Sequence, residues 1–380
     1  MINRHSYKLA GIRLLAAALL FFMVASQRGQ AAAAAVNASI TNQKIIQYVR
    51  ERFGIPDSTK LIVAPVQDSE YADFYKTTIF VQDGQKKSTQ PVLITKDWHY
   101  LVIGDILVAS TTAQRDPRAN ASTTDEKIVS FVRTKFHVPE NVKLTVGPFQ
   151  ESDYEGFYKA IIYGDNGTRK SSTPAFVTKD GRYTVIGSIF NLNADPRQEV
   201  QQSISLENQP TVGPRNAPVT IVEFADLECP TCAEMQKFIE TQLLPKYGNK
   251  IRIVFKEFPL VTIHDWALTA AIANECAYQL NPADFFRYRS IIFESQGMID
   301  AANVRTLLLD FGQRAGLDRL KLATCLDSKA SLPRVEADMR EGQKLGIMST
   351  PTLFINGVPV VGLNPDHIYQ LIDEALQKAR

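Results

Sequence analysis

The chain has 380 residues, of which 45% are hydrophobic and 22% are charged, so it can form two or three domains with sizeable cores. This composition excludes wholesale disorder. The formal net charge of +2 excludes the strongly basic character typical of nucleic-acid-binding proteins, so no nucleic-acid partner is expected.

The first 35 residues have the pattern of a targeting segment. Basic residues occur there without any acidic one, and the apolar run Leu14 to Ala25 has the length of a signal-peptide core. An alanine tract from Ala31 offers cleavage sites, and no cysteine nearby could carry a lipid anchor. We predict a signal peptide over residues 1–35, with an uncleaved N-terminal membrane anchor as the alternative. Either places the rest in the periplasm or another extracytoplasmic compartment, where disulfides persist.

The next segment contains a tandem repeat in which equivalent residues lie 83 positions apart. "KIIQYVRERFGIP" at Lys44 matches "KIVSFVRTKFHVP" at Lys127, and "TKDWHYLVIGDI" at Thr95 matches "TKDGRYTVIGSI" at Thr178. Each copy begins with apolar residues at helical spacing and continues with strand-like runs separated by turn signals. We therefore predict two α+β repeats over residues 40–115 and 123–198, each a helix against an antiparallel sheet.

The repeats carry no evident chemistry. They contain no cysteine, and His99 and His137 have no counterpart in the other copy, so both are expected to be surface residues. A polar linker is predicted over residues 199–211.

The stretch "EFADLECPTCAEMQ" from Glu223 places Cys229 and Cys232 two residues apart, as in a zinc clip, a structural staple or a redox pair. A near-continuous apolar strand precedes Cys229, and helical periodicity follows it. A thiolate is stabilised at a helix N-terminus, where backbone N–H groups are unpaired. Cys232, one turn further on, is well placed to attack a mixed disulfide formed on Cys229. This context favours the redox pair.

The order of elements predicts the fold of residues 212–380. After the Cys-Pro-Thr-Cys helix come the buried strand "NKIRIVFKEFPL" and helical patterns over about residues 262–345. The segment "MSTPTLFINGVPVVG" then predicts two strands joined by an Asn-Gly turn, and an amphipathic helix ends the chain. We expect an α/β thioredoxin fold with an inserted helical domain, preceded by the two α+β repeats.

Two resemblances carry these predictions further. Residues 212–380 resemble the DsbA-like thioredoxin family of thiol–disulfide oxidoreductases through "APVTIVEFADLECPTC", "KEFPL", "HDWALTAAIANECAYQ" and "GIMSTPTLFINGVPVVG". The repeat helix followed by "TKDGRYTVIGSIFNL" resembles the N-terminal domain of the DsbC and DsbG isomerases. In those isomerases this module dimerises the chain and helps to form a substrate cleft.

The DsbA-like resemblance implies roles for individual residues. Cys229 would be the exposed nucleophile and Cys232 the buried resolving thiol. Pro351 would be a cis-proline facing the pair, and the Thr350 backbone would bind a substrate peptide. For Glu223, on the core strand, the resemblance implies proton handling beneath Cys232. The alternative is a salt bridge to Lys256 on the neighbouring strand.

Cys276 and Cys325 complete the set of four cysteines. An even number of cysteines in an exported protein suggests pairing, and some members of the resembled family have such a second disulfide. The alternative is two buried free thiols. A structural zinc site needs four ligands, and His264 and His367 have no ligand-like spacing to the single CxxC motif. We expect neither a metal nor a cofactor.

The predicted function is transfer of the Cys229–Cys232 disulfide to exported unfolded or reduced proteins, with a membrane thiol oxidase recycling the pair. DsbA-type oxidants often have a histidine where this chain has Thr231, so the redox direction stays open. One alternative is an isomerase or reductase kept reduced by a membrane electron donor. Another is a chaperone or binding module led by the repeats. The repeats could pair within one chain or with a second chain.

Overall fold

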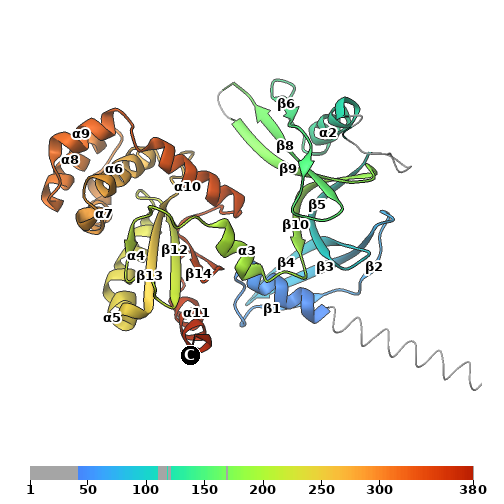
Figure 1. Cartoon of the computed structure of the whole chain (residues 1–380), viewed down its shortest axis with the longest axis horizontal. Coiled ribbons are helices and arrows are strands. Elements are labelled where there is room, and N and C mark those ends of the chain that lie inside the picture. The colour runs from blue at the N-terminus through green and yellow to red at the C-terminus, as the bar shows by residue number, and fades with distance from the viewer. Residues whose placement is uncertain (1–41, 110–117, 119–120, 168–169, 380) are drawn as a thin grey trace, which may run out of the picture. The chain divides into compact units, whose positions relative to one another are not determined.

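The computed structural model describes residues 42–109, 118, 121–167 and 170–379, which form two compact units (Figure 1). One unit contains the repeats and ends at Asn193. The other contains residues 194–380 together with residues 49–56. The predicted signal peptide, residues 1–35, lies outside the described residues. Within the described ranges, no helix is both long and apolar enough to cross a bilayer.

Both repeats have the predicted plan of one helix followed by a run of strands. The helices bury the residues that recur at helical spacing, Ile45 and Val49 in the first copy and Ile128 and Val132 in the second. The first copy comprises a helix over residues 42–53, β1 (Lys60–Val63), β2 (Gln67–Asp68), β3 (Phe74–Asp83), β4 (Lys86–Thr95) and β5 (Tyr100–Val108). The second comprises α2 (Ala121–Lys135), β6 (Lys143–Val146), β7 (Gln150–Glu151), β8 (Phe157–Asp165), β9 (Lys170–Thr178) and β10 (Tyr183–Asn191).

The two copies share one antiparallel sheet. Strand β5 of the first copy pairs with β10 of the second, from Tyr100 opposite Asn191 to Val108 opposite Tyr183. The strand order is β1-β3-β4-β5-β10-β9-β8-β6, with β2 beside β3 and β7 beside β8 (Figure 1). The pairing of the repeats within one chain is thereby confirmed.

Matching contacts across this junction obey a two-fold relation. The Tyr100 hydroxyl accepts a hydrogen bond from the Glu155 backbone N–H at 2.7 Å. The Tyr183 hydroxyl accepts one from the Ala72 backbone N–H at 3.0 Å. Tyr100 also packs edge-on against Phe157 of the other copy, as Tyr183 packs against a phenylalanine of the first copy. Because each tyrosine completes the core of the opposite copy, the apolar core runs across the junction.

Gly104 and Gly187 face each other at the centre of this pairing, and substitution of Gly104 tests how closely the strands approach. A Cβ atom on Gly104 would lie 2.4 Å from the Ile186 carbonyl oxygen. Gly104→Ala should therefore destabilise the sheet by roughly 2–3 kcal/mol. Hydrogen exchange of β5 and β10, followed by mass spectrometry of the full chain, should report the loss of protection.

Gly84→Ala is the matched control, because Gly84 also has positive φ but no atom within 4 Å of an added Cβ. Equal losses of protection at β5 and β10 in the two variants would contradict the close-approach explanation.

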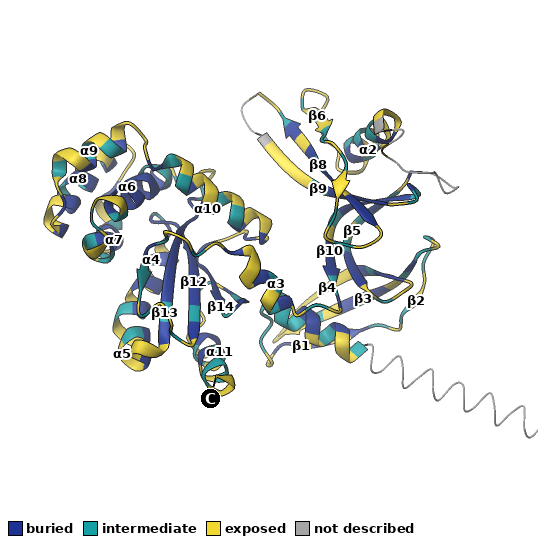
Figure 2. Cartoon of the chain, in the orientation of Figure 1, coloured by how far each residue is buried: buried dark blue, intermediate teal, exposed yellow. Residues whose placement is uncertain are grey.

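The C-terminal unit is built on a five-stranded sheet in the order β11-β13-β12-β14-β15. Strands β12 and β13 are parallel and the other pairs are antiparallel. Both faces of β12 are covered, as its apolar sequence predicts (Figure 2). The strands are β11 (Thr211–Val212), β12 (Val219–Ala225), β13 (Ile251–Glu257), β14 (Thr352–Ile355) and β15 (Val358–Val361).

The helices of this unit complete a thioredoxin fold. Helix α4 (Pro230–Phe238) follows β12 and continues through a π-helical turn (Ile239–Leu243) into α5 (Leu244–Tyr247). Five helices lie between β13 and β14, and α11 (Pro365–Lys378) ends the chain. This architecture confirms the predicted fold class. The five inserted helices are α6 (Ala267–Leu280), α7 (Pro282–Glu294), α8 (Val304–Ala315), α9 (Arg319–Asp327) and α10 (Leu332–Lys344).

The predicted linker over residues 199–211 is only partly irregular, which corrects the sequence interpretation. Helix α3 (Pro196–Ser203) begins at the Asp195 N-cap, with Pro196 in its first turn. Val200 and Ile204 are buried with Phe224 of β12. Two well-spaced apolar residues in an otherwise polar segment were enough to dock this helix onto the sheet.

Candidate active site

Cys229 lies between the end of strand β12 and the first residue of helix α4. It occupies the N-cap position, and Pro230 is the first residue of the helix. Cys229 is 7% exposed, whereas Cys232, one turn into the helix, is 0% exposed. Both are free thiols. Only Cys229 is therefore accessible to a reaction partner.

The surroundings of the two sulfurs separate their pKa values. A hydrogen bond from the Cys232 thiol, with smaller contributions from the Thr350 side chain and from backbone groups of α4, lowers the pKa of Cys229 to about 5 despite its burial. Burial, followed by the interaction with Cys229, raises the pKa of Cys232 well above its usual value. The pair thus combines a nucleophilic thiolate with a protonated thiol.

The loop before β14 reaches the first cysteine. The peptide bond between Thr350 and Pro351 is cis, and the Thr350 carbonyl oxygen lies 3.4 Å from the Cys229 sulfur, which donates to it when protonated. On another side, the Gln296 side-chain amide donates to the carbonyl oxygens of Leu227 and Cys229, at 2.7 Å and 3.1 Å. The structure thus brings Thr350 and Pro351 to the redox pair from a distant part of the sequence.

Glu223 is paired with Arg289 of helix α7, so the predicted alternative of a salt bridge to Lys256 is wrong. Arg289 Nη2 donates to Glu223 Oε2 at 2.7 Å, and both side chains are fully buried. Lys256 instead binds Asp338 and Glu341 of α10, each at 2.9 Å. The register explains the difference. Glu223 is opposite Phe255, so Lys256, one residue further along β13, points to the other face of the sheet.

Glu223 acts electrostatically on the redox pair. Burial raises the pKa of Glu223, and the charge and hydrogen bond of Arg289 partly oppose that rise. The charge of Glu223 is one of the influences that raise the pKa of Cys232. Among the described residues, no donor reaches Glu223 Oε1. The carboxylate whose charge acts on Cys232 thus has one oxygen that accepts no hydrogen bond from the described residues.

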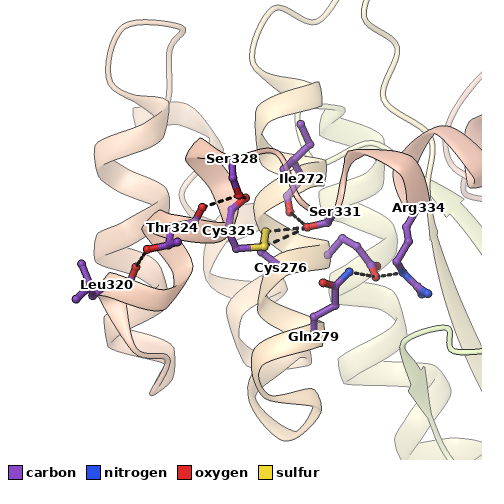
Figure 3. The surroundings of a disulfide bond; sticks show 10 residues. Ile272, Cys276, Gln279, Leu320, Thr324, Cys325, Ser328, Ser331 and Arg334 are labelled. Carbon is purple, nitrogen blue, oxygen red and sulfur yellow. Dashed lines mark hydrogen bonds and ion pairs between the residues drawn. A yellow bond between two sulfur atoms is a disulfide. The ribbon is translucent and has the colours of Figure 1, made fainter.

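Cys276 and Cys325 form a disulfide between helices α6 and α9 (Figure 3). Cys276 is fully buried, and the hydroxyl of Ser331 lies 2.7 Å from its sulfur. The same hydroxyl donates to the Ile272 carbonyl oxygen at 3.3 Å. The bond joins two segments 49 residues apart within the helical insertion, and closing a loop of that size restricts the unfolded chain.

Sequence reasoning missed several charged residues near the pair. Asp226 is 1% exposed, and its backbone N–H donates to the Cys232 sulfur at 3.5 Å. Its side chain binds His264, for which the sequence suggested no role. Glu257, buried on β13, accepts a hydrogen bond from Asn274, and burial raises the pKa of Glu257 to about 8. In the sequence, only the position of Asp226, three residues before Cys229, indicated that one of these residues could lie near the cysteine pair.

Within the described part of the chain, no group of three or more His, Cys, Asp or Glu side chains could hold a metal ion. The ionisable groups that act on Cys232 include Cys229, through a hydrogen bond, and Glu223, through its charge.

Several known proteins are similar to part of this chain. Residues 205–374 match the family described as thioredoxin. The chain is 32% identical to Na(+)/H(+) antiporter NhaA 1 of Salinispora arenicola over 38% of its own length, but covers only 21% of that protein. It is 28% identical to disulfide bond formation protein D of Bacillus subtilis, over 46% of this chain and 79% of that protein. The crystal structure of oxidised BdbD from Bacillus subtilis matches at 27% identity with a TM-score of 0.42, over 46% of this chain and 95% of that one.

The C-terminal half of this chain has a thioredoxin fold, seen in its sheet and in the helix that starts at the Cys-Pro-Thr-Cys motif, and it matches the thioredoxin family over residues 205–374. Within that class it is similar to the DsbA-like disulfide oxidoreductases.

The separated pKa values predict which thiol reacts. In reduced protein, Cys229 should be alkylated with a rate that is half-maximal near pH 5, because its thiolate population rises through that pH. Cys232 should remain unlabelled across the same range. A short pulse of alkylating agent at each pH, followed by mass spectrometry, measures both rates.

Cys232→Ala provides the internal comparison. It removes the hydrogen bond that contributes most to the low pKa of Cys229, so the midpoint should move upward. Labelling mainly at Cys232 in the unmodified chain, or a Cys229 midpoint above about pH 8, near that of a free thiol, would overturn the assignment.

Proposed function

We propose that this protein is a dithiol oxidase that donates a Cys229–Cys232 disulfide to exported proteins. The stabilised Cys229 thiolate carries the proposal. Because the pKa of Cys229 is about 5, the reduced form is ionised and favoured at neutral pH. A redox pair whose reduced form is stabilised gives up its disulfide readily, as a strong oxidant does.

The exchange proceeds through two displacements. A substrate thiolate attacks the Cys229 sulfur of the oxidised pair, forming a mixed disulfide and releasing the sulfur of Cys232, which takes up a proton. A second substrate thiolate then attacks the substrate sulfur of the mixed disulfide and releases Cys229 as a thiolate. Two electrons pass from the substrate to the protein, and the substrate gains one disulfide.

Glu223 and the Thr350–Pro351 loop assist these steps. Glu223 supplies a buried carboxylate that passes a proton to the departing Cys232 sulfur and accepts it again on reoxidation. Its raised pKa supports this role, since a carboxyl group that ionises nearer neutrality can hold a proton transiently. The Thr350 backbone, whose carbonyl oxygen lies 3.4 Å from the Cys229 sulfur, offers a peptide hydrogen-bonding site beside the mixed disulfide.

The rim of the site favours unfolded substrates. Several loops that contact the redox region carry exposed apolar side chains, which would bind apolar segments that a folded protein hides. Hydrogen bonds from neighbouring residues hold two of these loops at the site. Gln296 binds the Cys229 carbonyl oxygen, and the Gly362 N–H binds the Pro351 carbonyl oxygen. The exposed residues are Val261, Ile263, Met298, Met348 and Val361.

A disulfide-transfer assay tests the proposal. The oxidised full-length chain should convert two thiols of a reduced, unfolded substrate into one disulfide per chain, whereas Cys229→Ser should convert none. The readouts are free-thiol titration and mass spectrometry of the substrate.

Two outcomes would favour the alternatives. If the reduced chain rearranged a scrambled substrate while the oxidised chain transferred no disulfide, the protein would be an isomerase. If Cys229→Ser promoted substrate folding as well as the unmodified chain, the repeats would act as a chaperone.

The repeats are proposed to be a docking platform for the substrate. They contain no cysteine, and their shared sheet gives one continuous surface. A chain beginning at Ala194 should retain turnover of a small dithiol but react more slowly than the full chain with a large unfolded substrate. Equal rates on the large substrate would contradict the docking role.

Localisation and recycling complete the proposal. The basic and apolar N-terminal sequence supports export by a signal peptide to an extracytoplasmic space, where a membrane thiol oxidase would reoxidise Cys229 and Cys232.

A further inference from the structure

Two acidic side chains in the segment before Cys229 form hydrogen bonds with the backbone of the loop between β13 and α6. Asp226 Oδ2 accepts a hydrogen bond from the Leu260 backbone N–H at 2.7 Å. Glu228 Oε2 accepts one from the Trp266 backbone N–H at 2.8 Å. The two acids lie three residues and one residue before Cys229, so the loop is held beside the Cys-Pro-Thr-Cys motif at Leu260 and at Trp266.

His264 is the cationic side chain that this loop brings to the site. Its Nδ1 lies 2.7 Å from Asp226 Oδ2, and the Asp226 side chain is fully buried. A buried carboxylate needs a compensating charge. In the described ranges, no lysine or arginine forms an ion pair with Asp226 or Glu228. His264 is therefore positioned to be the counter-charge of this acidic pair.

The groups around His264 favour its protonated form. Burial alone would lower the pKa of His264, but the hydrogen bond and charge of Asp226, with the charges of Glu228 and Cys229, outweigh burial and raise it. Asp265, the next residue, adds a further negative charge to the loop. The charges that raise the pKa of His264, those of Asp226, Glu228 and the Cys229 thiolate, are all negative.

The residues between the two cysteines, Pro230 and Thr231, carry no charge. Asp226 and Glu228, three residues and one residue before Cys229, would by themselves disfavour a thiolate, since like charges repel. We propose that His264 is a positioning residue that provides the positive charge for the Cys229 thiolate from outside the Cys-Pro-Thr-Cys motif. This inference rests on the proposed function of Cys229 as the exchanging thiol.

The first test removes the charge but keeps a hydrogen-bond donor. In the full-length chain, His264→Gln should raise the pKa of Cys229, measured from the pH dependence of alkylation, by on the order of one unit. It should shift the equilibrium with glutathione toward the disulfide form by about tenfold, because a one-unit pKa shift is a tenfold change in an equilibrium constant.

His99→Gln is the matched control. His99 also binds an aspartate, with Nδ1 3.0 Å from Asp97 Oδ2, but it belongs to the repeats. This variant should leave both the Cys229 pKa and the glutathione equilibrium unchanged.

A second measurement needs no variant and reports a charge interaction that a purely structural contact would not produce. Coupling between two titrating groups is reciprocal. The imidazole of His264, followed by NMR in the unmodified chain, should therefore titrate at higher pH in the reduced protein than in the oxidised protein, where Cys229 has no charge. The spectrum of His99 should not depend on the redox state.

The outcomes separate this inference from the proposed function. A folded His264→Gln variant with an unchanged Cys229 pKa, or a His264 pKa that is the same in both redox states, would overturn the role of His264 alone. An unmodified chain in which Cys229 does not react would instead remove the proposed function.

Discussion

The hydrogen bonds that converge on the Cys229 sulfur govern the chemistry of the C-terminal unit. They allow a sulfur that is 7% exposed to carry a negative charge, although burial alone would neutralise it. The donors come from the first turn of α4, from Cys232 within it and from the loop before β14. The sheet and helices hold these segments in contact, so the low pKa depends on the whole unit being folded.

The same arrangement keeps the second sulfur out of reach. Cys232 is fully buried, and the Asp226 backbone N–H donates to its sulfur. The charge of Glu223, which is fully buried in a pair with Arg289, also acts on this sulfur. A buried ion pair contributes little net stability but is costly to break, because removing one partner leaves the other uncompensated. Loss of Arg289 would therefore leave an uncompensated buried carboxylate whose charge acts on Cys232.

The sequence was sufficient for the fold and for the position of Cys229 and Cys232 at the start of a helix, because those depend on local signals. Apolar runs, helical spacing, the CxxC motif at a helix start and the Asn-Gly turn at Asn356 each act over a few residues. The partner of Glu223 depends on strand register and on a helix 66 residues further along the chain, which no local pattern encodes. For the same reason, the pairing of His264 with Asp226, 38 residues away, escaped prediction. Helix α3 was missed because its apolar contacts are few and most of its surface is polar.

Because the repeats share one sheet within one chain, the pairing of β5 with β10 does not depend on protein concentration. Strands β5 and β10 present matching edges, and such edges on separate chains would associate only at sufficient protein concentration. Here both edges belong to one polypeptide, so each meets the other at an effective concentration on the order of millimolar. Dilution that would separate two chains leaves this sheet intact, so a single molecule carries the complete platform wherever it diffuses.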